Sequence, residues 1–83
     1  MMLYQEDFKK KAQEVCKGVL GFAPALKNIT LLEAGNNEFE AIDWIIFKVN
    51  KTEYKICLAD PFMLVYNLYK FVDDETVFLG SYH

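Results

Sequence analysis

The side chains most often used for proton transfer and nucleophilic attack are scarce in this sequence. The single histidine is His83 and the single serine is Ser81, two residues apart at the last positions given. A Ser/His pair needs a carboxylate that orients the imidazole, and none stands in a recognisable position beside this pair. The sequence has no HxxxH, no paired CxxC, no calcium-type acidic loop and no glycine-rich phosphate loop. We therefore predict a protein that is not an enzyme and uses no metal or cofactor.

Asp43 is the acid whose position is most suggestive of acid–base chemistry. Strict alternation along residues 39–49 places it on one face of a strand with Phe39, Ala41, Ile45, Phe47 and Val49. Apolar neighbours would desolvate this carboxylate and raise its pKa, as a general acid requires. A β-bulge near residues 41–43 would instead turn the side chain outward. The first alternative predicts a small-ligand-binding protein or small enzyme, with a helix–sheet pocket around Asp43 and a tyrosine such as Tyr54.

Residues 61–72 form the most apolar segment of the chain. Asp60 is a good N-cap residue, and Pro61 suits the first position of a helix. On such a helix Asn67 and Lys70 would make one narrow polar stripe, so the helix must be enclosed or present aromatic surface to a partner. Because aromatic side chains are enriched at interfaces, we predict a second helix over 61–72 with three candidate partner-binding residues. They are Phe62, Tyr66 and Tyr69.

An acidic triplet directly after this segment completes the candidate partner-binding set. It consists of Asp73, Asp74 and Glu75. Acids at the C-terminus of a helix oppose its dipole, and local conflicts of this kind are expected at functional sites. Lysines or arginines of a partner would explain the triplet. The alternative is a solvated turn before a final strand.

The elements that would position these residues follow from periodicity. Apolar residues at spacings of three and four predict an amphipathic helix over 4–17, and Pro24 argues against its continuing past residue 23. Strand-like segments cover 29–34, 39–49, 52–59 and 76–82, with turns at 35–37, 50–51 and 73–75.

The predicted fold is a single small α+β domain over residues 1–83 with the order α-β-β-β-α-β. An antiparallel meander of three to four strands would be packed by two helices, with the last strand at an edge. Periodicity leaves open whether the helices share a face of the sheet. If they do, the face that carries Ile42, Trp44 and Ile46 is left half covered.

Composition narrows the class of partner. The net charge is −3, residues 28–83 carry nine acids against four lysines, and arginine is absent. Arginine is the usual residue for bidentate phosphate and guanine recognition, so these features argue against direct nucleic-acid binding and favour a basic target. No apolar run reaches the length of a membrane span, and Cys16 and Cys57 lack a metal-binding or redox spacing. We expect a cytoplasmic protein with two buried free thiols.

These observations favour a non-catalytic protein–protein interaction module, an inhibitor or adaptor that acts on a host protein. Its contact surface would combine the aromatic side of residues 62–71 with acids from 33–43 and 73–75. In size, acidity and lack of catalytic groups the chain resembles small inhibitors carried by phages and mobile elements, anti-CRISPR proteins among them. A homodimer through the last strand or the aromatic helix is a further prediction.

Overall fold

The computed structural model describes residues 5–36 and 42–83, and it opens with an amphipathic helix. α1 (Gln5–Leu20) buries the stripe Phe8, Ala12, Val15 and Cys16. It ends at Gly21, which has a φ of 85° and donates its backbone N–H to the Lys17 carbonyl at 3.1 Å. Glycine suits this left-handed capping position because it has no Cβ. The predicted helix is confirmed and continues to Leu20; residue 4, its predicted start, lies outside the described residues.

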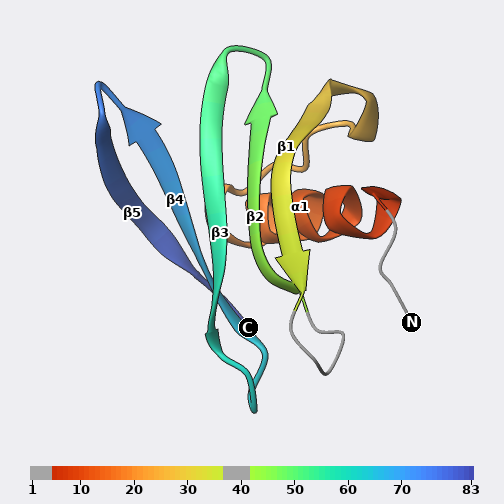
Figure 1. Cartoon of the computed structure of the whole chain (residues 1–83), viewed down its shortest axis with the longest axis vertical. Coiled ribbons are helices and arrows are strands. Elements are labelled where there is room, and N and C mark those ends of the chain that lie inside the picture. Colours follow the sequence, from red (N-terminus) through yellow and green to blue (C-terminus); the bar gives the residue numbers. More distant parts are fainter. Residues whose placement is uncertain (1–4, 37–41) are drawn as a thin grey trace.

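A short 3₁₀ helix, η1 (Leu26–Asn28), leads from α1 into a five-stranded antiparallel sheet (Figure 1). The strands are β1 (Ile29–Asn36), β2 (Ile42–Val49), β3 (Thr52–Asp60), β4 (Val65–Val72) and β5 (Glu75–Tyr82). Each strand pairs with its predecessor in the chain, so β1 and β5 are the edges. The predicted edge position of the last strand is confirmed, whereas residues 39–41, at the predicted start of the second strand, lie outside the described residues.

Two-residue turns connect β2 to β3 and β4 to β5. Val49 pairs with Thr52 across the first turn, and Asn50 takes a φ of 56°. Asp73 and Asp74 form the second turn with φ values of 46° and 68°. Two successive positive φ values are typical of the type I′ hairpin turn, in which Asn and Asp are tolerated. The hairpin predicted at 50–51 is confirmed, and the acidic triplet belongs to a hairpin rather than to a helix end.

The predicted helix over residues 61–72 is wrong, because this segment is a turn followed by β4. The Asp60 carboxylate does accept backbone N–H groups, from Phe62 at 3.0 Å and Met63 at 3.2 Å, but the chain then enters a strand at Val65. β4 has partly buried side chains on both faces, and that pattern resembles a helix that is apolar all round. The observed order is therefore α-β-β-β-β-β, with α+β as the correct class.

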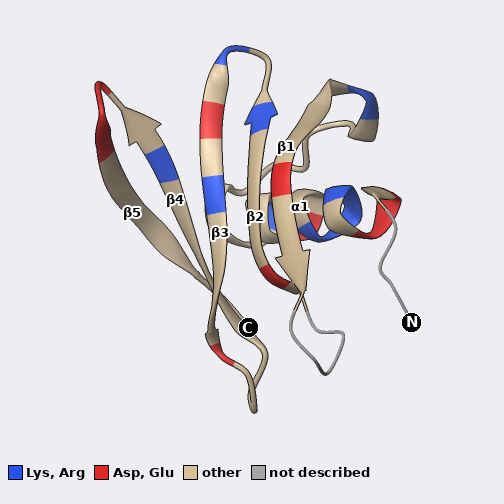
Figure 2. Cartoon of the chain, in the orientation of Figure 1, with Lys and Arg blue, Asp and Glu red and all other residues tan. Residues whose placement is uncertain are grey.

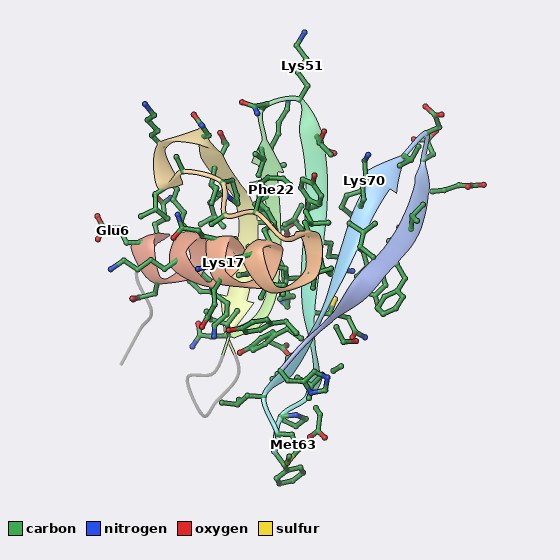
Figure 3. The ribbon with its side chains drawn as sticks, turned by 180° about the vertical axis from the view of Figure 1, so that it is seen from behind. Glu6, Lys17, Phe22, Lys51, Met63 and Lys70 are labelled. Carbon is green, nitrogen blue, oxygen red and sulfur yellow. The ribbon has the colours of Figure 1, made fainter. Side chains whose placement is uncertain are left out.

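The core lies between α1 and one face of the sheet, which we call the covered face. In Figure 1 the helix lies behind the strands, and in Figure 3 it lies in front of them. Ile45, Ile56 and Leu68 are opposite one another on three neighbouring strands, and each is 0% exposed. Phe47 is also fully buried and stacks on Tyr54 with 5.4 Å between ring centroids. These residues meet the buried stripe of α1 in one hydrophobic cluster.

The end of α1 lies close to β5, and a glycine allows that approach. A Cβ atom built on Gly18 would overlap the ring of Tyr82. The Tyr82 hydroxyl donates a hydrogen bond to Glu14, which raises the pKa of Tyr82. Lys11 lies 2.9 Å from the Glu14 carboxylate, and both partners lower the pKa of that carboxyl, Lys11 more strongly. The contact fixes the last turns of the helix against the edge strand.

A β-bulge resolves the two alternatives for Asp43. Gly35 pairs with Trp44 whereas Asn36 pairs with Ile42, so Asp43 is an extra residue in β2. One extra residue restores the alternation on either side of it and turns the extra side chain away from the core. Asp43 is exposed while Ile42 is 7% exposed. The predicted placement of this carboxylate among apolar side chains, on which the general-acid interpretation depended, is therefore wrong.

Candidate functional site

The face of the sheet opposite α1 carries a second set of apolar side chains. Residues directly opposite each other on neighbouring strands point to the same side, so the strand register defines this face. Within residues 5–36 and 42–83 no helix or strand packs on it (Figure 1). We call it the open face and define it by these residues: Thr30, Glu33, Gly35, Trp44, Ile46, Lys48, Glu53, Lys55, Cys57, Asn67, Tyr69, Phe71, Thr76, Phe78 and Ser81.

Trp44 has a fixed place on the open face because it lies over a glycine. Gly35 is its partner on β1, and a Cβ built there would come within 2.7 Å of the indole Nε1 and 2.9 Å of Cε2. Both distances are shorter than real Cβ contacts, so the ring occupies the space that any other residue would fill. The Trp44 ring is half-buried in this way without contributing to the core.

Beside Trp44 lies an open depression of about 400 Å³. Its lining combines the indole and Ile46 with charged groups of both signs, the carboxylates of Glu33 and Asp43 and the amine of Lys55. Glu33 and Asp43 are exposed, and Lys55 is half-buried. Glu33 is opposite Ile46, which is opposite Lys55, so the acid and the amine are separated by a whole strand. Figure 2 shows the acid on β1 and the lysine on β3.

Two aromatic rings extend the open face toward its β5 edge. Tyr69 and Phe78 are opposite each other, and their ring centroids are 5.6 Å apart at an interplanar angle of 59°. Tilted pairs of this kind hold both rings in place. Tyr69 is half-buried, whereas 55% of Phe78 is exposed. An exposed ring held against a second ring is a preformed apolar contact point.

The turn between β3 and β4 presents three consecutive apolar residues to solvent. Phe62 is 94% exposed, Met63 73% and Leu64 51%. The turn is ordered by the two hydrogen bonds to Asp60, and Leu64 adopts a φ of 53°, a region that costs a non-glycine residue on the order of 1 kcal/mol. We call residues 62–64 the apolar tip; Figure 3 shows Met63 at the far end of the turn.

The six predicted partner-binding residues do not form one surface. Tyr66 is 3% exposed on the covered face, where the Lys11 ammonium lies 5.1 Å from its ring centroid and burial raises its pKa. Tyr69 is on the open face, and Phe62 belongs to the apolar tip. Asp73, Asp74 and Glu75 are exposed at the opposite end of β4, roughly 26 Å from the tip at the usual rise per residue. Only Phe62 and Tyr69 remain near the open face.

Asp43 and Tyr54, proposed from sequence as the polar groups of one pocket, are on different sides of the sheet. Tyr54 stacks on Phe47 beneath the helix, whereas the depression that contains Asp43 is on the open face. The Ser81 hydroxyl donates to the Asn67 side-chain carbonyl at 2.7 Å rather than to an imidazole. Among the described residues no group of three His, Cys, Asp or Glu side chains could hold a metal ion.

The two thiols, Cys16 and Cys57, lie on opposite sides of the sheet. Cys16 is 1% exposed in the core, and Cys57 is half-buried on the open face, so the predicted burial holds only for Cys16. Both are free thiols.

The contribution of Phe78 was missed because residues 61–72 were assigned to a helix, which left the last strand without the neighbour that orients it. The alternation of Trp44 and Ile46 was the available signal for the open face.

Comparison with known proteins gives no relative for this chain: no family model, no curated protein and no solved structure matches it significantly. None of the helices in the described residues is long and apolar enough to cross a membrane.

The aromatic helix that was a predicted route to a homodimer does not exist. Pairing of the exposed edge of β5 with a second copy stays a prediction.

Proposed function

We propose that the chain is a non-catalytic binding module that acts on another protein as an inhibitor or adaptor. Its binding surface combines the open face with the apolar tip. The observation that carries this proposal is a set of aromatic side chains on one face that no described element covers: Trp44 on β2, and the Tyr69–Phe78 pair on the far side of β3. Exposed apolar patches beyond isolated residues mark interaction sites more often than chance surface.

The two parts of this surface are at the same end of the sheet. β2 starts with Ile42 and runs antiparallel to β3, which ends with Asp60. Asp43 and Trp44 are therefore at the end of the sheet from which the apolar tip extends. A partner that contacts Trp44 can also receive Phe62, whose 94% exposure leaves almost the whole ring available. Buried aromatic anchors of this type account for most of the affinity at interfaces.

Charge favours a basic partner. Asp43 and Asp60 are at the tip end of the sheet, and Glu33 lies further along β1, level with Lys55; Glu33, Asp43 and Lys55 line the depression. Figure 2 shows these acids on three different strands. Complementary charge at an interface increases the association rate and excludes wrong partners more than it increases affinity. An inhibitor of the type carried by phages and mobile elements would act through such a surface.

The test is affinity capture with the tagged chain in cells of its natural source, followed by measurement of the purified complex. Phe78 and Phe22 are a matched pair, because both are 55% exposed. Phe22 follows α1 on the covered side of the sheet (Figure 3). We expect Phe78→Ala or Phe62→Ala to weaken a stoichiometric complex at least about tenfold, and Phe22→Ala to leave it unchanged.

Two results would contradict the proposal. A complex that is lost with Phe22→Ala and kept with Phe78→Ala and Phe62→Ala would place the binding surface on the helix side. A chain that turns over or tightly binds a small molecule and captures no protein would move it to the class of enzymes or ligand-binding proteins.

A further inference from the structure

The depression beside Trp44 has the chemistry to hold a basic side chain. We propose that it receives an arginine or lysine side chain of the bound protein, with arginine favoured. This inference rests on the proposed function and names the group that the open face recognises. Three features of its lining carry it: the indole, the two acids Glu33 on β1 and Asp43 on β2, and the apolar side chain of Ile46.

The indole supplies the first part of the site. Because Gly35 has no side chain, the Trp44 ring packs against the backbone of β1 without any bound group. A cation over the face of a tryptophan is attracted by the quadrupole of the ring, and tryptophan is the strongest of the aromatic residues in this interaction. The planar guanidinium group also stacks on such a ring, which an ammonium cannot do.

The strand register places the negative charge on one side of the depression. Glu33 is on β1 and Asp43 is the bulged residue at the start of β2, whereas Lys55 is on β3. Glu33 and Lys55 are separated by two strand spacings, roughly 10 Å between their backbones. A guest cation on the β1 and β2 side of the depression is nearer to the two acids than to Lys55, which lines the same depression from β3 together with Cys57 and Leu58.

The bulge at Asp43 is the feature that brings the second acid to this place. Without the extra residue, alternation would point Asp43 into the core with Ile45 and Phe47. With it, the carboxylate is exposed and lines the depression beside Trp44. The apolar stem of an arginine or lysine would lie along Ile46, as such stems do on apolar surface.

The test uses Trp44 as its own reporter, since it is the only tryptophan in the chain. The probe is N-acetyl-argininamide, and the control is N-acetyl-citrullinamide, which has nearly the same shape and no charge. We expect the arginine compound to change the Trp44 emission saturably at millimolar concentration. The citrulline compound should bind about tenfold more weakly because it lacks the cation–π and ionic contacts.

Four variants of the chain test which charged side chains contact the bound cation. Glu33→Gln and Asp43→Asn should each weaken binding of the arginine compound about two- to fivefold, the effect of one solvent-exposed ionic contact. Lys55→Met should strengthen it by a similar factor, because a like charge is removed. Glu53→Gln is the matched control: it makes the same change as Glu33→Gln on the same face, but Glu53 is opposite Lys48, near the other end of the sheet, and does not line the depression. It should leave binding unchanged.

Four outcomes would overturn the inference. The citrulline compound binds as tightly as the arginine compound, or the Trp44 emission does not respond to the arginine compound. Alternatively, Lys55→Met binds the arginine compound more weakly than the parent chain, or Glu53→Gln loses as much affinity as Glu33→Gln. Weaker binding by Lys55→Met together with a response to N-acetyl-glutamate amide would identify an anion site. A failure of this inference can be distinguished from a failure of the proposed function, because binding of N-acetyl-argininamide is measured without any protein partner. A chain that captures its partner through Phe78 and ignores the arginine compound refutes this inference alone.

Discussion

Ile45 and Ile46 are neighbours in β2, yet they belong to two different environments. Ile45 is 0% exposed beneath α1, and Ile46 is half-buried beside the depression on the open face. Apolar surface removed from water by the helix stabilises the fold, whereas the apolar surface of the open face is ordered by the sheet without being enclosed. The comparison indicates that the stabilising core and the proposed binding surface are on opposite faces of one sheet, so we expect substitutions to alter each separately.

The largest expected effect separates these two isoleucines. Ile45→Ala should lower the free energy of unfolding by about 2–5 kcal/mol, because it leaves a cavity in the packed core. Ile46→Ala should cost less than about 1 kcal/mol, since water already reaches that side chain. Urea unfolding followed by circular dichroism measures both values. If Ile45→Ala fails to fold, Ile45→Val, which should cost about 0.5–1.5 kcal/mol, takes its place. Equal losses at the two positions would remove the distinction between the faces.

From the buried thiol of Cys16 we predict how the free energy of unfolding changes at alkaline pH. Burial raises the pKa of Cys16 from 9.0 to about 11. Between these values the unfolded chain releases a proton that the folded chain keeps, so the free energy of unfolding falls as pH rises. The loss should reach about 2 kcal/mol at pH 11.

Comparison of the protein with Cys16→Ala isolates this effect. The pKa values of Tyr54, Tyr66 and Tyr82 are also raised, mainly by burial for the first two and by the bond to Glu14 for the third. Their contribution has the same sign and is common to both proteins, except for the smaller part of the Tyr54 shift that comes from Cys16, which is lost with the thiol and adds to the difference. Urea unfolding at several pH values from 8 to 11 should therefore show a steeper decline for the parent chain. Parallel curves would mean that Cys16 ionises in the folded state as readily as in the unfolded chain.

Gly18 gives a smaller effect on the covered face. Replacing a glycine inside an exposed helix with alanine normally stabilises by about 1 kcal/mol. Here the new Cβ would overlap the Tyr82 ring, so we expect Gly18→Ala to destabilise by about 1 kcal/mol instead. In a Tyr82→Ala background the same substitution should stabilise the chain, because the obstacle is gone. Urea unfolding of the parent chain, the two single variants and the double variant measures whether the effect of Gly18→Ala changes sign. If the sign does not change, the Tyr82 ring does not restrict the helix.

The sequence was sufficient to predict the elements whose patterns have a single interpretation. The stripe of Phe8, Ala12 and Val15 repeats every three to four residues, and Asn50 begins a two-residue hairpin. β4 was missed because Tyr66 and Leu68 are buried by α1 while Tyr69 and Phe71 are half-buried on the other face. A strand with apolar residues on both faces has no alternation. The cap at Asp60 then favoured a helix, although a side chain that accepts N–H groups two and three residues ahead also orders a tight turn.

The candidate site was less predictable than the fold, because it depends on register. Trp44 reaches its place by pairing with Gly35, and the register of that pair follows from one extra residue in β1 between Leu31 and Glu33, whereas the extra residue at Asp43 sets the direction of the Asp43 side chain. No local pattern distinguishes a bulge from an interruption of the strand, so the alternatives for Asp43 stayed open until the pairing was known. Phe62 was predicted as a contact residue on the wrong element, and its exposure follows from the turn rather than from a helix face.

Gly35→Ala is the open-face counterpart of Gly18→Ala, and we expect the smallest change in stability from it. The new Cβ would come within 2.7 Å of the Trp44 ring, but this ring can move into the neighbouring depression instead of into a core. Alanine also suits a strand better than glycine, by about 0.5–1 kcal/mol, which offsets the displacement. The free energy of unfolding should therefore stay within about 0.5 kcal/mol of the parent value. The Trp44 emission should shift and the response to N-acetyl-argininamide should weaken, because the indole no longer lies where the acids face it. A loss of stability equal to that of Gly18→Ala would mean that Trp44 packs as a core residue, and the open face would then be a second core.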